Sequence, residues 1–126
     1  MSDLSATQNT HRYQNERNWS TSEKRIARKV FDAALKRELQ DVMRKTKQMA
    51  NQIKEPADTW ELEHYLTERR KEINRKYEFR SPRLKQVLGA LLRESRLGEE
   101  GLRGLPQDKL ESIRSYAKFL AESDAA

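Results

Sequence analysis

The pattern of apolar and polar residues changes at Ser20. Residues 1–18 are polar and show no periodicity, which predicts a disordered tail. From Ser20 onward, apolar residues recur every three, four or seven positions, which predicts a first long helix over about residues 20–54. This stripe consists of Ile26, Val30, Ala34, Leu35, Leu39, Val42, Met49 and Ile53. Ser20 and Glu23 have the spacing of a capping box, which marks the start of the helix.

A second long helix is expected to follow after a short turn. Pro56 should end the first helix, because the residue before a proline avoids the helical conformation. Asp58 and Glu61 repeat the capping-box spacing and predict a second helix over about residues 58–80. Its apolar stripe is Leu62, Leu66, Ile73 and Tyr77.

Two shorter helices complete the predicted architecture. Ser81 and Pro82 are a cap and a first-turn proline, and they begin a helix over about residues 82–97. A last helix over about residues 106–121 follows a glycine-rich turn. Residues 19–126 are therefore expected to form a single all-α domain, with two long antiparallel helices and a small C-terminal helical head.

The length of the first helix suggests that the protein is a dimer. A helix of this length spans about 50 Å, whereas a small domain is only about 30 Å across. The helix must therefore extend beyond its own core and leave part of its apolar stripe uncovered. A homodimer with an isologous interface would cover it, and the alternative is a monomeric bundle with a frayed first helix. The residues expected at the dimer interface are Leu39, Val42, Met49, Ile53, Trp60 and Leu66.

Composition narrows the class of protein. The chain has 126 residues, of which 35% are hydrophobic and 37% charged, so it has room for one small domain with a thin core. No stretch approaches the roughly 18 apolar residues of a membrane span, and residues 1–18 lack the apolar segment of a secretory signal. The absence of cysteine excludes disulfides and thiolate metal sites, and two histidines are too few for a metal cluster unless carboxylates supply most of the ligands. We expect a cytoplasmic protein with no cofactor and no metal.

The net charge of +6 is concentrated in residues 21–54, which carry ten basic and four acidic residues. Such a segment is either a solvated helix face or a surface for phosphates or an acidic protein. A nucleic-acid-binding module that uses the face from Lys24 to Lys54 is one hypothesis. Against it, acidic residues interrupt this face at three positions, and there is no recognition-helix turn. The three acidic residues are Asp32, Glu38 and Asp41.

Catalytic chemistry is not expected, because the sequence offers no nucleophile with a base and no glycine-rich phosphate loop. A cluster of a different kind lies on the second helix, where Trp60, Glu63 and His64 fall within about one turn and Arg70 follows within two more. Tryptophan and arginine are typical of interface hot spots. In the alternative interpretation, Trp60 covers the core and Arg70 pairs with a neighbouring glutamate.

From Trp19 to about Ile113 the sequence carries a series of short motifs in unbroken order. They are Trp19-Ser20-x-x-Glu23, Phe31, Arg37-Glu38-Leu39, Ile53, Trp60-x-Leu62, Leu66, Arg70-x-Glu72-Ile73, Lys76-Tyr77, Arg80, Val87, Leu91-Leu92-x-Glu94, Leu102, Leu105, Asp108-Lys109 and Ile113. In these motifs the chain resembles the cyanobacterial fluorescence recovery protein family, as a divergent member.

The resemblance implies an all-helical, non-enzymatic dimer that binds a protein. The family binds the C-terminal domain of photoactivated orange carotenoid protein and speeds its return to the resting orange form, which ends energy quenching at the thylakoid-associated phycobilisome. In the family, a tryptophan and an arginine on the second long helix lie in the partner-contact patch, and they match Trp60 and Arg70. The implied partner-binding residues are Trp60, Glu63, His64 and Arg70.

Two departures from the family pattern fall in regions expected to touch the carotenoid protein. Glu63-His64 stands where the family has a His-Asp pair, and Gln86 and Leu88 stand where its head carries an aromatic pair. An alternative function is therefore that of a homologue with a different protein client, unrelated to photoprotection.

Overall fold

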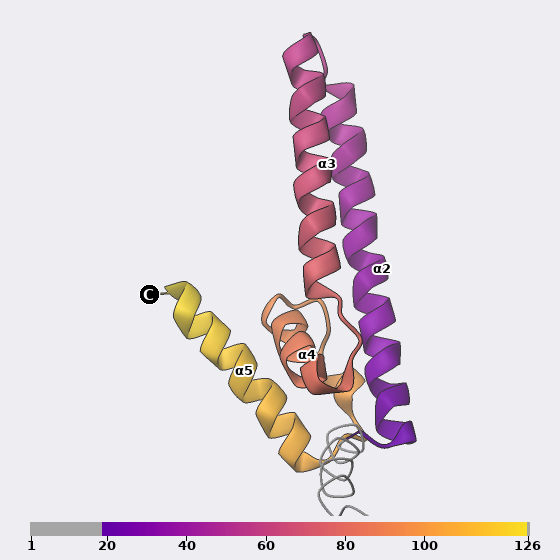
Figure 1. Ribbon diagram of the computed structural model, residues 1–126, viewed down its shortest axis with the longest axis vertical. Coiled ribbons are helices and arrows are strands. Elements are labelled where there is room, and N and C mark those ends of the chain that lie inside the picture. Colours follow the sequence, from indigo (N-terminus) through magenta and orange to yellow (C-terminus); the bar gives the residue numbers. More distant parts are fainter. Residues whose placement is uncertain (1–18, 126) are drawn as a thin grey trace, which may run out of the picture.

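The computed structural model describes residues 19–125, which form helices and no strand. The elements are α2 (Thr21–Asn51), α3 (Pro56–Lys76), the 3₁₀ turn η1 (Ser81–Arg83), α4 (Leu84–Arg93), the 3₁₀ turn η2 (Glu99–Leu102) and α5 (Gln107–Ala125). The predicted all-α class is confirmed, with two long antiparallel helices and a small helical head (Figure 1). The predicted tail lies outside the described residues.

The start of α2 is fixed by the capping box that the sequence predicts. The backbone N–H of Glu23 donates to Ser20 Oγ at 3.1 Å, and the N–H of Ser20 donates to Glu23 Oε1 at 2.9 Å. Glu23 also accepts a hydrogen bond from Lys109 Nζ on α5 at 2.6 Å. Since Lys109 lies 5.0 Å from the centre of the buried Trp19 ring, this end of α2 is held against α5.

The turn between the long helices differs from the prediction. The predicted capping box of Asp58 and Glu61 is wrong, because α3 begins two residues earlier, at Pro56. Proline suits the first helical position, where its missing N–H would have no partner. The Asp58 carboxylate accepts hydrogen bonds from the backbone N–H groups of Lys54 and Glu55, at 2.9 and 3.1 Å. These bonds close the turn, and α2 therefore ends at Asn51 rather than near residue 54.

The end of α3 is set by aromatic packing. α3 ends at Lys76, four residues before the predicted end near Arg80. The rings of Tyr77 and Phe79 both meet Phe31 edge-on, with centroids 5.4 and 5.2 Å away. In an extended segment, residues two apart point to the same side, so leaving the helix allows both rings to reach Phe31.

The head helices also differ from their predicted lengths. The predicted helix over residues 82–97 is a 3₁₀ turn followed by α4, which ends at Arg93. Ser95 has a φ of 60°, and the N–H of Arg96 donates to the carbonyl of Leu91 at 2.8 Å, which terminates the helix. α5 continues to Ala125 instead of ending near residue 121.

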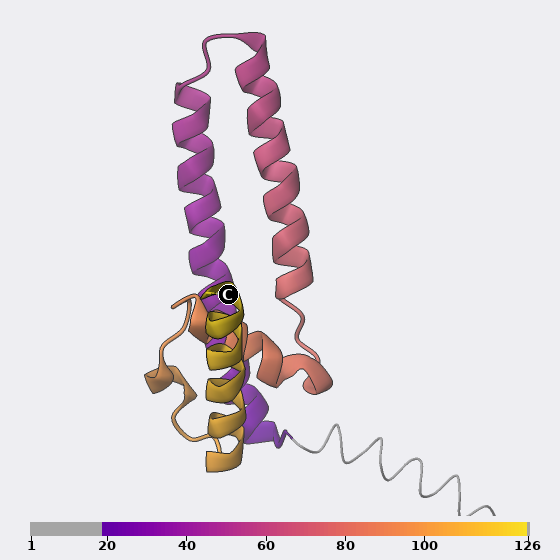
Figure 2. The ribbon, with the colours of Figure 1, turned by 90° about the vertical axis from the view of Figure 1, so that its left-hand side faces the viewer.

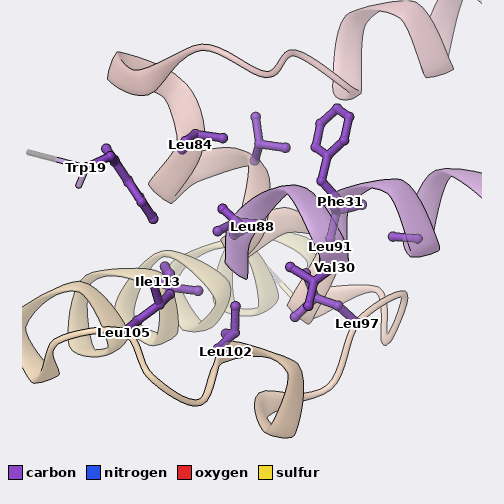
Figure 3. Close-up of a cluster of buried hydrophobic side chains, with 13 residues drawn as sticks. Trp19, Val30, Phe31, Leu84, Leu88, Leu91, Leu97, Leu102, Leu105 and Ile113 are labelled. Carbon is purple, nitrogen blue, oxygen red and sulfur yellow. The ribbon is translucent and has the colours of Figure 1, made fainter. Parts of the chain in front are cut away.

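The hydrophobic core lies in the head and against the first half of α2. Its buried side chains come from α2, α4, η2, α5 and the loops beside them (Figure 3). They are Trp19, Ala27, Val30, Phe31, Ala34, Leu84, Val87, Leu88, Leu91, Leu97, Leu102, Leu105 and Ile113. Gly89 allows α4 and α5 to approach closely, because a Cβ there would lie 2.9 Å from Tyr116 Cδ1.

The rest of the hairpin extends beyond this core (Figures 1 and 2). The buried residues of α2 end at Glu38, and α3 has no buried residue at all. At 1.5 Å per residue, the 31 residues of α2 span about 46 Å. The overhang that the sequence predicts is thus observed in the single chain. None of the described helices is long and apolar enough to span a bilayer.

Candidate functional site

A hollow of about 360 Å³ lies between α2 and α3, and we call it the hairpin hollow. Its lining residues are Leu39, Val42, Glu63, Leu66, Thr67, Arg69, Arg70, Ile73 and Asn74. Two of them, Glu63 and Arg70, are predicted partner-binding residues, and three more belong to the predicted dimer interface. The structure therefore brings together residues that the sequence assigned to two separate roles.

Trp60 and Arg70 are both available to a partner. The Trp60 side chain is 65% exposed, so it does not cover the core. The neighbours of Arg70 form ion pairs, Arg69 with Glu72 and Lys71 with Glu68, whereas Arg70 is exposed and pairs with no described residue. The alternative in which Trp60 is a core residue and Arg70 a surface ion pair is wrong.

The other two predicted partner-binding residues, Glu63 and His64, point in different directions from α3. Trp60, Glu63 and Arg70 are three and seven residues apart, so they fall on one face of the helix. His64 is exposed but lies about 100° around the helix from Glu63 and does not line the hairpin hollow. The acidic group, and not the imidazole, therefore shares a face with Arg70.

An apolar strip on α2 continues from the hairpin hollow. Leu39 lines both this hollow and a second depression of about 380 Å³, whose other walls are Asp32, Leu35, Lys36, Gln40 and Met43. Leu39, Ile53 and Leu66 are exposed, while Val42 and Met49 are half-buried. Met49 and Ile53 line neither hollow.

Met43 was missed by the sequence analysis, although its side chain is 58% exposed beside Leu39. Its position four residues after Leu39 is the signal that could have identified it.

A buried carboxylate lies next to this surface. The Glu38 side chain has no exposed area and accepts hydrogen bonds from Arg69 Nη2 at 2.6 Å, Lys76 Nζ at 2.9 Å and Tyr77 Oη at 2.7 Å. Arg96 Nε lies 3.5 Å from its other side. We call these five residues the Glu38 cluster. Sequence reasoning treated Glu38 only as an interruption of a basic face, although it lies seven residues after Phe31, on the core side of α2.

The electrostatics of the cluster keep Glu38 charged. Burial alone would raise its pKa, but the hydrogen bonds from Lys76, Tyr77 and Arg69 and the charge of Lys76 outweigh burial and lower the pKa from 4.5 to about 2. Burial and the neighbouring carboxylate raise the pKa of Tyr77, which keeps its hydroxyl protonated as a donor. Among the described residues, no group of three or more acidic or histidine side chains is arranged to hold a metal ion.

Comparison with known proteins identifies the family. The model of the family described as "Photoprotection regulator fluorescence recovery protein" matches residues 19–117. The chain belongs to the fluorescence recovery protein family. The resemblance found in the sequence motifs is thereby confirmed, together with the expectation of a regulatory, non-enzymatic protein.

Relatives of known structure agree with this assignment. The chain is 33% identical over 101 residues to the fluorescence recovery protein of Synechocystis sp. PCC 6803, which covers 80% of this chain and 93% of that protein. The Fremyella diplosiphon fluorescence recovery protein structure superposes with a TM-score of 0.76 at 34% identity, and covers 79% of this chain and 98% of that one. The Synechocystis structure gives the same TM-score and coverage at 33% identity.

The two head residues that depart from the fluorescence recovery protein pattern, Gln86 and Leu88, have different surroundings. Leu88 has no exposed surface and lies in the core, so its side chain does not reach the surface of the head. Gln86 is half-buried, and its Oε1 atom is buried without a hydrogen-bond partner among the described residues. The change at Leu88 therefore affects packing of the head rather than a binding surface.

Proposed function

We propose that this chain binds the C-terminal domain of photoactivated orange carotenoid protein and accelerates the return of that protein to its resting orange form. This ends energy quenching at the phycobilisome, and the protein would act in the cytoplasm at the thylakoid-associated complex. Membership of the fluorescence recovery protein family supports the regulatory role. The observation that carries the proposal is the exposure of Trp60 and Arg70 on α3, with Arg70 lining the hairpin hollow between the long helices.

The binding chemistry divides between these two side chains. Trp60 supplies a large apolar surface that loses water on contact, and Arg70 offers a planar fork of donors to a carboxylate of the partner. Glu63, on the same face, favours a partner that carries a cation beside that carboxylate. His64 lies at the edge of this surface.

Acceleration then follows from differential binding. The two domains of the carotenoid protein pass through a particular geometry as they rejoin. A protein that binds this geometry more tightly than it binds the open form lowers the free-energy barrier for the return to the resting form. No bond chemistry is required, since the rate gain comes from positioning.

We also propose that the chain is a homodimer built on the overhanging hairpin. α3 has no buried residue in the single chain, and the apolar side chains of Leu39, Met43 and Leu66 face solvent. In an isologous contact between two hairpins, each protomer would cover this strip on the other. Further interface residues would be Val42, Met49, Ile53 and Trp60.

The test compares two variants of neighbouring cations on α3. Arg70→Leu should abolish acceleration of the red-to-orange recovery of orange carotenoid protein while the dimer mass stays unchanged. Lys71→Leu removes an exposed charge outside the hairpin hollow and should act like the wild type. Retained acceleration by Arg70→Leu would remove Arg70 from the binding surface.

Two other functions are less well supported than binding of the carotenoid protein. A dimer that does not bind or accelerate the carotenoid protein would indicate a homologue with a different client. A nucleic-acid role is not favoured, because Arg28 pairs with Asp32 at 3.2 Å and Arg44 with Asp41 at 3.0 Å along the basic segment.

A further inference from the structure

Among the described residues, Glu38 is a charged residue whose side chain has no exposed surface. Its hydrogen-bond and ion-pair partners come from three parts of the chain. Arg69 and Lys76 belong to α3, Tyr77 follows α3, and Arg96 follows α4 in the head. A single carboxylate on α2 therefore holds the end of the second long helix and a turn of the head at once.

Arg69 connects this cluster to the partner-binding surface. It lines the hairpin hollow on one side and a polar depression of about 450 Å³ around Glu38 on the other. Its Nη2 atom lies 2.6 Å from Glu38 Oε2, and it is the residue that precedes Arg70. Any rotation or sliding of α3 against α2 would break this bond and move Arg70 together with Arg69.

The head side of the cluster is bound to α2 by more than one contact. Arg96 Nη1 donates to Asp41 at 2.5 Å, and the carbonyl of Arg96 accepts from Arg37 Nη1 at 2.9 Å. Lys76 also donates to Glu94 at 2.8 Å, which ties the end of α3 to the end of α4. The end of α3 lies beside α2 immediately before the chain enters the head (Figures 1 and 2).

Within the single chain, apolar packing alone does not fix the position of α3. It has no buried residue, and its apolar side chains toward α2 are half-buried or exposed. Contacts of this kind tolerate small shifts, whereas charge-assisted hydrogen bonds are short and directional. The specific bonds of the Glu38 cluster are therefore the contacts best able to set the register of α3.

We infer that Glu38 is a positioning residue for partner binding, which sets the register of α3 against α2 and the head and thereby the place of Arg70. The inference rests on the proposed function for its effect on the partner, but the register itself is a property of the free protein. Glu38 does not touch the partner in this account. It acts through Arg69 and α3.

The structural part of the test uses distances within one chain. The protein has no cysteine, so two spin labels attach only at introduced cysteines. The exposed Lys71 on α3 and Lys118 on α5 give one pair, and Lys47 on α2 with Lys118 gives a reference pair. Labelled chain is mixed with an excess of unlabelled chain, so that each measured distance lies within one protomer.

Glu38→Gln keeps the shape of the side chain but removes its charge. It should broaden or shift the distribution between residues 71 and 118 and leave that between 47 and 118 unchanged, because residue 47 belongs to α2, whose first half is fixed in the core. The matched control is Asp32→Asn, an exposed carboxylate on the same helix that pairs within α2. It should leave both distributions unchanged. Unchanged distances in Glu38→Gln would overturn the inference.

The functional part asks whether the effect passes through Arg70. Glu38→Gln should raise the concentration needed for half-maximal acceleration of recovery by about 10- to 100-fold, the range typical of a misplaced contact group. An Arg70→Lys background keeps the charge but not the planar pair of guanidinium donors. In that background the same change should raise the half-maximal concentration by less than about twofold. An equally large effect in that background would mean that Glu38 acts by some other route, and the inference would fail.

The two proposals fail in different ways. If the wild type does not accelerate recovery, the proposed function is wrong, and the distance measurements alone decide the role of Glu38. If the wild type accelerates and Glu38→Gln matches Asp32→Asn, the inference is wrong and the function stands. Should Glu38→Gln not fold, Tyr77→Phe removes one of the bonds to the carboxylate and should show the same changes at smaller size.

Discussion

Acidification should destabilise this protein mainly through Glu38. The folded state holds this carboxylate charged against Lys76, Tyr77 and Arg69, and lowers its pKa from 4.5 to about 2. In the unfolded chain the pKa returns to its ordinary value, so the unfolded state binds a proton at a pH where the folded state does not. The stabilisation is therefore complete above about pH 5 and is lost as the pH falls from about 4.5 to 2.

The difference between these two pKa values corresponds to about 3 kcal/mol. This is a large part of the roughly 5–15 kcal/mol that holds a small domain folded. The pKa of Glu23 is also lowered, by its hydrogen bonds from Lys109 and Ser20, and those of Asp41 and Asp58 are lowered by bonds from Arg96 and from the turn backbone. These groups act in the same direction, so a comparison that cancels them is required.

Urea denaturation of the wild type and Glu38→Gln, followed by circular dichroism at pH 6 and pH 2, provides that comparison. Protomer concentration is held fixed, because dimerisation adds to apparent stability. The advantage of the wild type over the variant should shrink by about 3 kcal/mol between the two pH values. An equal difference at both pH values would show that Glu38 contributes no proton linkage, contrary to this prediction.

Three further substitutions test other parts of the structure. Leu88→Ala, at a position with no exposed surface, should lower the free energy of unfolding by about 2–5 kcal/mol in urea denaturation, and a loss below about 1 kcal/mol would contradict its place in the core. Leu39→Glu should produce monomers of unchanged helix content in sedimentation velocity; an unchanged dimer mass would locate the dimer contact elsewhere. Gly104→Ala places a Cβ 2.8 Å from Ile26 Cδ1 at a φ of 102° and should lower stability by about 1 kcal/mol or more, whereas an unchanged Tm would argue against strain there.

Local signals in the sequence predicted the helices well. The capping box of Ser20 and Glu23 involves neighbouring residues only, and it forms as predicted. The predicted start of α3 was two residues too late, because Asp58 is not the cap. It lies at the third helical position and accepts hydrogen bonds from two backbone N–H groups. The end of α3 depends on Phe31, more than forty residues away, which no local pattern reveals.

The candidate site, too, was predictable only where it depends on local helical spacing. The common face of Trp60, Glu63 and Arg70 follows from helical spacing, but their exposure depends on how α3 packs on α2. Glu38 could not be recognised, because a lone glutamate in a charged helix resembles a solvated residue. Its hydrogen-bond partners lie 31, 38 and 39 residues away in the sequence.

We propose above all that this chain restores the resting state of orange carotenoid protein. The most direct measurement is the rate of red-to-orange recovery in the dark of photoactivated orange carotenoid protein, with and without this protein, with the mass of the sample determined by light scattering. We expect a recovery rate that rises with added protein, and a dimer in the absence of the carotenoid protein. A stable dimer that leaves the recovery rate unchanged at excess concentration would contradict this proposal.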